Sequence, residues 1–191
     1  LVYATQQLNL WGTRLIKKDA VKTHLVSVLT PVEDWTENDV AAELEYVMRK
    51  NGAEDKSFET IAVSGKKSSM PHGVPSSVKL SHGFLTMDFG ALYEGYHSDM
   101  TRTVSIGKAD EEMKKLYNTV LKAQTSALEM LKAGVTGAEA DKVARDIIYV
   151  DYEGYFGHSL GHGVGLEIHE RPNLSYTNDK PLVPGNIVTV E

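Results

Sequence analysis

Apolar residues recur every three to four positions in three stretches of the chain, which is the pattern of amphipathic helices. The first stretch begins after Thr36 and stops at Gly52, the second extends from Asp110 to Gly134, and the third begins after Thr136. We expect each apolar stripe to face the core. The stripes comprise Val40, Leu44, Val47 and Met48 in the first stretch, Met113, Leu116, Tyr117, Val120, Leu121, Leu128 and Leu131 in the second, and Ala140, Val143, Ala144 and Ile147 in the third.

Two threonines mark the starts of these helices. Thr36 has Asp39 three residues later, and Thr136 has Glu139 at the same spacing, as in a capping box. Residues 14–29 are also expected to form a helix.

Strand-like segments lie between the helices. Residues 58–64, 84–89, 96–106 and 186–191 combine β-branched and aromatic side chains and are bounded by turn residues. Residues 91–95 are expected to turn the second strand into the third.

The helical pattern that ends at Gly52 recurs about 100 residues later, over residues 111–154, with Thr36 and Thr136 in equivalent positions. This repeat predicts an α+β fold of two related halves, with helices outside, strands inside and a pocket where the halves meet. We find no linker that would separate independent domains, so residues 1–191 are predicted to form one domain.

The composition is that of a soluble globular protein, with 41% hydrophobic and 24% charged residues. Since 26 acidic residues outnumber 20 basic ones, giving a net charge of −6, no binding to nucleic acid or to an anionic membrane is expected. The apolar runs are too short to span a bilayer and the first residues do not resemble a secretory signal, so a cytoplasmic location is predicted. The chain has no cysteine, so only oxygen and imidazole ligands could hold a metal.

Two aspartates lie inside predicted strands, where this residue is disfavoured. Asp88 and Asp99 would come together across a hairpin, and their like charges would repel unless a cation lay between them. A divalent metal, or a pair of them, would resolve this repulsion. The simpler alternative is that each aspartate caps a turn or pairs with Arg102 or a lysine.

A histidine cluster farther along the chain favours the metal site over this alternative. His158, His162 and His169 fall within twelve residues in a glycine-rich segment, and imidazole is a common metal ligand. Farther along, the apolar segment 184–191 ends in the carboxylate of Glu191. Ordinary core or surface roles are expected for the isolated histidines His24, His82 and His97.

Together these motifs resemble the pita-bread metallopeptidases, the group that contains methionine aminopeptidases, Xaa-Pro aminopeptidases and Xaa-Pro dipeptidases. The resemblance covers residues 36–191, and the sequence motifs are more similar to those of the proline-specific branch than to those of the methionine branch. It rests on the two aspartates eleven residues apart and on the segments S-D-M-T-R-T, G-H-S-L-G-H-G-V-G, I-H-E-R-P and P-G-N-I-V-T-V-E. The implied fold is a curved antiparallel sheet with helices on its outer face and two pseudo-symmetric halves.

The resemblance also implies roles for individual residues. Asp88 would bind one metal and Asp99 would bridge both, while His162 would bind the other and Glu191 would complete its coordination. Glu191 would also handle a proton. Three histidines would lie in the substrate pocket: His72 and His158 would line it, and His169 would contact the scissile amide and assist proton transfer.

The implied activity is hydrolysis of the bond preceding proline in Xaa-Pro dipeptides or at the N-terminus of short peptides. Two divalent ions would activate a hydroxide for this reaction, with manganese expected first and cobalt, zinc or iron as alternatives. The expected partners are a short proline-containing peptide and a second copy of the chain in a homodimer.

Other interpretations remain open: a methionine aminopeptidase-like enzyme, a metal-independent hydrolase of the creatinase type, or a non-catalytic pita-bread binding module. Compared with the family, the chain lacks the usual N-terminal domain and ends before a second bridging glutamate. We therefore expect this polypeptide by itself to bind metal weakly and to hydrolyse little.

Overall fold

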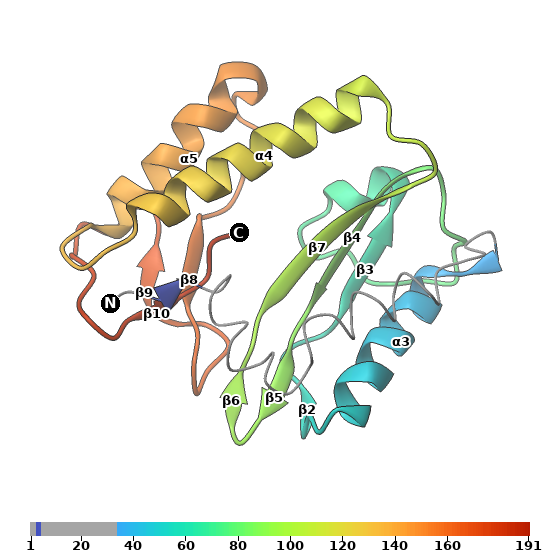
Figure 1. The fold of residues 1–191 in the computed structure, drawn as a ribbon. Helices are drawn as coiled ribbons and strands as arrows, with labels where there is room; N and C mark the ends of the chain where they lie inside the picture. Colours follow the sequence, from blue (N-terminus) through green and yellow to red (C-terminus); the bar gives the residue numbers. More distant parts are fainter. Residues whose placement is uncertain (1–2, 5–33) are drawn as a thin grey trace. The chain divides into compact units, whose positions relative to one another are not determined.

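The computed structural model describes residues 3–4 and 34–191, drawn as coloured ribbon in Figure 1. The chain divides into two compact units, each with its own hydrophobic core. The N-terminal unit is Asn9–Met113, and the C-terminal unit combines Leu1–Leu8 with Lys114–Glu191. The helix predicted over residues 14–29, and His24 within it, lie outside the described residues.

Helix α3 (Glu37–Lys50) begins the described part of the N-terminal unit. Its start is fixed by a complete capping box, because the Thr36 hydroxyl accepts the Asp39 N–H while the Asp39 carboxylate accepts the Thr36 N–H. The chain leaves the helix through Gly52, whose φ of 103° suits glycine. The predicted apolar stripe of this helix is confirmed, since all four of its side chains are buried.

Two small antiparallel sheets complete the N-terminal unit. One sheet has the strand order β3-β4-β7, and apolar side chains of α3 pack against β3 and β4 to form the core. The other has the order β2-β5-β6. The strand bounds are β2 Asp55–Lys56, β3 Ile61–Ser64, β4 Gly83–Phe89, β5 Ala91–Tyr93, β6 Tyr96–His97 and β7 Met100–Ile106, with a 3-10 helix η2 at Gly65–Ser69.

Three predictions for this region need correction. The strand expected over residues 96–106 is broken after His97, so Ser98 and Asp99 lie between β6 and β7. The segment 91–95 is not all turn, because its first three residues form β5 and only Glu94 and Gly95 turn the chain, both with positive φ. The strand expected over 58–64 is confirmed only from Ile61 onward.

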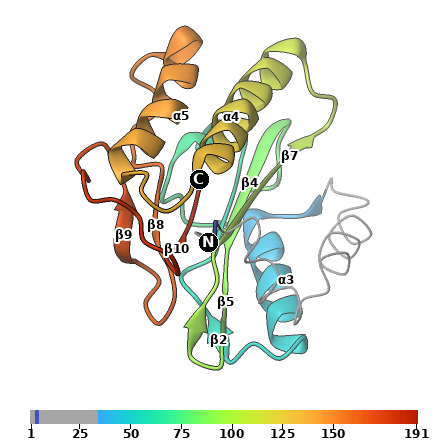
Figure 2. The same cartoon turned by 60° about the vertical axis from the view of Figure 1, so that its left-hand side comes forward.

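The C-terminal unit places two helices, α4 (Glu111–Met130, beginning just before the unit) and α5 (Gly137–Tyr152), beside a four-stranded sheet (Figures 1 and 2). Its strand order is β1-β10-β8-β9, and only the β1–β10 pair is parallel. Of the strand predicted over 186–191, two residues enter the ladder. The strand bounds are β1 Tyr3–Ala4, β8 Gly161–Gly163, β9 Glu170–Leu174 and β10 Ile187–Val188.

The apolar stripe predicted for α4 is wrong in its first half. Tyr117, Val120 and Leu121 are exposed, whereas the fully buried residues of this helix are Ala123 and Ala127. Small side chains let the helix backbone approach its neighbours closely, so its core contact does not follow the largest residues. Among the described residues, no helix is long and apolar enough to span a membrane.

The two capped helices are anchored in the same way, as the predicted repeat requires. Thr136 forms a capping box with Glu139 at the start of α5, matching that of Thr36. Each capping threonine also forms an isolated antiparallel bridge, Thr36 with Lys79 and Thr136 with Pro181. The two units therefore share a helix-start motif that is tied to a downstream segment.

Candidate metal centre

In the N-terminal unit, one aspartate lies in the β4–β7 ladder and the other directly follows its last pair. Asp88 lies in β4 opposite Thr101, and Asp99 directly precedes β7. Continuing the ladder by one residue sets Asp99 opposite Gly90, on the same face as Asp88. Gly90 is buried against the chain at Ser98, and a side chain there would collide with the Ser98 carbonyl oxygen. The sequence thus directs two carboxylates to one face, with no side chain at position 90 between them.

The contacts of Asp88 address the alternative in which this aspartate pairs with Arg102 or a lysine. The Thr101 hydroxyl donates to Asp88 Oδ1 at 2.9 Å. Arg102 lies opposite Met87 in the ladder, so its side chain starts from the other face of the sheet. Arg102 donates instead to the Thr101 carbonyl oxygen at 2.7 Å.

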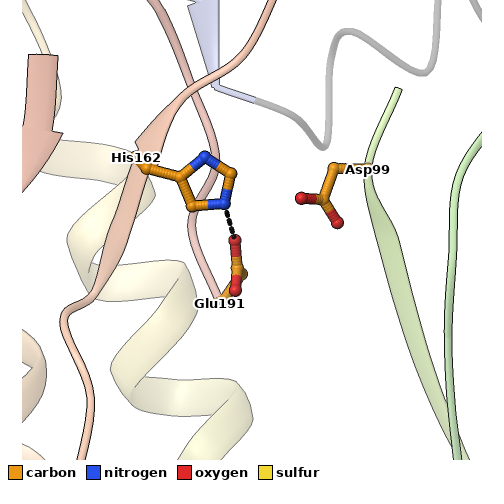
Figure 3. Close-up of side chains that lie close together, drawn as sticks. All are labelled: Asp99, His162 and Glu191. Carbon is orange, nitrogen blue, oxygen red and sulfur yellow. Dashed lines mark ion pairs between the residues drawn. The ribbon is translucent and has the colours of Figure 1, made fainter. Parts of the chain in front are cut away.

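In the C-terminal unit, His162 and Glu191 lie close together (Figure 3). His162 Nε2 lies 3.1 Å from Glu191 Oε1. His162 Nδ1 lies 2.9 Å from the Gly163 carbonyl oxygen, which fixes the orientation of the ring. The adjacent strands set this geometry, because Thr189 N–H donates to the His162 carbonyl oxygen at 2.7 Å.

Thr189 also shapes the electrostatics of the carboxylate. Its buried hydroxyl accepts the His162 N–H at 2.9 Å and hydrogen-bonds to Glu191. Burial acts to raise the pKa of the Glu191 carboxyl, but the hydrogen bonds to His162 and Thr189 outweigh burial and lower that pKa below its usual value. Glu191 is therefore held in the ionised form that a cation requires.

The three histidines expected in the substrate pocket occupy different places. His72 is exposed in a turn of the N-terminal unit. His158 and His169 are exposed in the C-terminal unit, where the rings of His162 and His169 meet edge to face with centroids 4.4 Å apart. His158 Nδ1 lies 2.8 Å from the Ser159 carbonyl oxygen.

The isolated histidines behave as expected where the structure describes them. His97 Nδ1 lies 2.8 Å from the Ser57 hydroxyl, and His82 Nε2 lies 3.1 Å from the Lys108 carbonyl oxygen. Each ring thus has a local partner.

A buried ion pair behind the histidine segment was not found from the sequence. Asp141 and Arg145 lie one turn apart in α5, and the Asp141 side chain is completely buried. The available signal was that Asp141 falls next to Ala140 in the inward-facing stripe, where an unpaired acid would be very costly. Arg145, four residues later on the same helix, supplies the opposite charge that Asp141 needs.

These side chains suit a divalent cation. Asp88, Asp99 and Glu191 offer carboxylate oxygens and His162 offers an imidazole nitrogen, a donor set for hard to borderline ions such as manganese, iron, cobalt or zinc. Within the C-terminal unit, His162 and Glu191 are already oriented toward each other.

Comparison with known proteins agrees with this chemistry. The profile of metallopeptidase family M24 matches residues 15–191. An Xaa-Pro dipeptidase of Pyrococcus horikoshii is 46% identical over 171 residues, which cover 86% of this chain and 49% of that protein.

Solved structures of similar sequence also share the fold. An Xaa-Pro dipeptidase from Bacillus anthracis superposes with a TM-score of 0.86 at 47% identity, covering 91% of this chain and 49% of that one. An X-Pro aminopeptidase from Thermotoga maritima gives a TM-score of 0.83 at 46% identity, covering 89% and 49%. The predicted α+β pita-bread fold is confirmed, and the chain spans about half the length of the relatives it matches.

Proposed function

Because this chain belongs to metallopeptidase family M24, we propose that its protein hydrolyses the peptide bond preceding proline, in Xaa-Pro dipeptides or at the N-terminus of short Xaa-Pro peptides. The names of similar proteins, Xaa-Pro dipeptidase and X-Pro aminopeptidase, support this substrate class. The observation that supports a metal centre most directly is the 3.1 Å approach of His162 Nε2 to Glu191 Oε1.

The proposed ligands are three carboxylates and one imidazole. Asp99, His162 and Glu191 (Figure 3) would each supply one ligand atom to a divalent ion. Asp88, which lies in β4 near the end of the β4–β7 ladder, would join Asp99 in holding a second ion. Manganese is the first candidate for a carboxylate-rich site without sulfur.

Two divalent ions, when bound, would supply Lewis-acid activation of water and of the scissile carbonyl group. The protein's own groups would then orient the peptide and move protons. His169 would donate a hydrogen bond toward the carbonyl oxygen of the scissile amide, and Glu191 would accept a proton. His72 and His158, both exposed, would line the substrate pocket.

The test is metal analysis of the full-length protein, followed by assays on three peptides. With manganese present, Ala-Pro and a longer peptide that begins with Ala-Pro should be cleaved, and the faster of the two distinguishes a dipeptidase from an aminopeptidase. A peptide that begins with Met-Ala serves as the control and should be cleaved at least tenfold more slowly. Preferred cleavage of the Met-Ala peptide, or no metal-dependent cleavage of any, would refute the proposal.

A further inference from the structure

Helix α5 has two ion pairs at the same four-residue spacing in very different settings. Lys142 and Asp146 pair at the surface, with side chains 71% and 62% exposed. Asp141 and Arg145 pair inside the unit, with side chains 0% and 18% exposed. Arg145 Nε and Nη2 donate to the two carboxylate oxygens of Asp141 in the fork geometry that arginine favours.

The buried pair also holds the segment that precedes β8. Arg145 donates to the Phe156 carbonyl oxygen at 2.8 Å and to the His158 carbonyl oxygen at 2.6 Å. Asp141 Oδ1 accepts the Leu160 N–H at 3.0 Å. The pair therefore holds two carbonyl oxygens and one N–H group of residues 156–160.

From Leu160 the connection continues to both candidate ligands. The carbonyl oxygen of Leu160 accepts the Glu191 N–H at 2.9 Å. His162 follows two residues later in β8, and its own N–H is held by Thr189. A shift of the Leu160 backbone would thus move Glu191 relative to His162.

We propose that Asp141 and Arg145 are positioning residues of the metal centre, which fix the backbone that aligns His162 with Glu191. This inference rests on the proposed function, because it takes these two side chains as metal ligands. Neither Asp141 nor Arg145 touches the ion. Their effect passes through the backbone groups of residues 156–160.

The first test measures manganese binding by calorimetry with the full-length protein. Arg145→Lys keeps the charge but cannot reproduce the fork that reaches Asp141 and both carbonyl oxygens. The manganese Kd of this variant should rise on the order of tenfold, as for other residues that orient metal ligands. Lys142→Arg, a charge-conserving change on the exposed face of the same helix, should leave the Kd unchanged. An unchanged Kd in Arg145→Lys would overturn the proposal.

The second test uses no metal. In protein labelled with ¹⁵N-histidine, the ring signals of His162 are assigned by their loss in His162→Gln. Arg145→Lys should shift these signals in the metal-free protein, while Lys142→Arg should not. A loss of thermal stability with unmoved His162 signals would show a purely structural role and refute the inference.

The two tests separate this inference from the proposed function. If the unmodified protein binds no manganese, the proposed function fails, and the ring signals still decide whether the pair aligns His162. If Arg145→Lys does not fold, Asp141→Asn replaces it in both experiments. That variant keeps an acceptor for the Leu160 N–H but loses the charge that orients Arg145, so the same shifts are expected and their absence counts against the proposal.

Discussion

Glu37 in the N-terminal unit and Asp141 in the C-terminal unit are almost fully shielded from solvent, and each has a cation beside it. Glu37 accepts hydrogen bonds from Lys67 at 2.6 Å, from the Ser64 N–H at 2.9 Å and from the Ser76 hydroxyl at 2.8 Å. A buried carboxylate requires such partners, because its desolvation is otherwise uncompensated. In each unit the partners lie in or beside a loop that contains a candidate substrate histidine.

Removing the charge of Glu37 should destabilise the fold. Glu37→Gln leaves the Lys67 ammonium without its buried partner, and we expect a loss of about 3 kcal/mol in the free energy of unfolding at pH 7. Urea unfolding measures this. The control is Glu59→Gln, because Glu59 also pairs with a lysine at 2.6 Å but is 89% exposed, and its loss should stay within about 0.5 kcal/mol.

The same carboxylate should make stability depend on pH. Burial acts to raise the pKa of Glu37, but the hydrogen bonds from Lys67, Ser64 and Ser76 outweigh it and lower that pKa below its usual value. A lowered folded-state pKa stabilises the protein above the unfolded-state pKa, and this contribution is lost as pH falls through the folded-state pKa. The stability difference between the native protein and Glu37→Gln should therefore shrink in acid, and a constant difference would contradict this assignment.

Asp99 lies in the break between two strands and is proposed to bridge two ions. Asp99→Ala in the full-length protein should reduce metal-dependent hydrolysis of Ala-Pro by roughly a thousandfold or more, since both ions lose a shared ligand. Steady-state kinetics with saturating manganese measure the effect. Asp146→Ala, which removes an exposed aspartate of α5, should retain full activity. Comparable turnover in the two variants would exclude the bridging role.

Among the elements, the helices were predicted best where a cap fixes their start. Thr36 and Thr136 each present an acid three residues later, and this local signal needs no tertiary information. The stripe of α4 was partly wrong. Leu128 and Leu131 pack against the core as expected, but the buried contact of the helix is made by Ala123 and Ala127, and only the packed neighbours reveal that a small residue is required there. The break at Asp99 likewise depends on the close approach of the Ser98 carbonyl group to Gly90.

The candidate ligands came from the sequence in two ways. Aspartates in predicted strands and clustered histidines are unusual and pointed to Asp99 and His162, whereas Glu191 was included through the family resemblance. The positioning role proposed for Asp141 and Arg145 was not predicted. It would act through backbone groups of residues 156–160, and the sequence does not reveal which side chains bind those groups.

Glycines next to the histidines allow a sharp test of strand packing. At Gly161, an added methyl group would collide with the Thr189 carbonyl oxygen, whereas at Gly157 it would meet no atom within 4 Å. Gly161→Ala should therefore cost about 1–3 kcal/mol in unfolding free energy and separate β8 from β10 near His162. Gly157→Ala should be close to neutral. Chemical denaturation of both variants provides the comparison. Equal stabilities would show that β8 and β10 can move apart at Gly161 without a measurable loss of stability.

On the scale of the molecule, the proposed ligands are far apart in the sequence, so metal binding should stabilise the folded protein. Manganese at a hundred times its Kd should raise the free energy of unfolding by about 2.7 kcal/mol, because only the folded state offers the assembled ligands. Differential scanning calorimetry would record a higher Tm, and a chelator should reverse it. A Tm that is insensitive to manganese would argue against a site built by folding.

Leu160 is buried and both of its backbone polar groups are engaged, since its N–H donates to Asp141 and its carbonyl oxygen accepts the Glu191 N–H. Its amide proton can exchange only when the hydrogen bond to Asp141 opens and water reaches this N–H. In deuterium oxide, this proton should persist as long as the slowest ones of the C-terminal unit, whereas that of exposed Gly157 should disappear early. Isotope exchange at a single amide would thus report how rarely the scaffold behind the histidines opens.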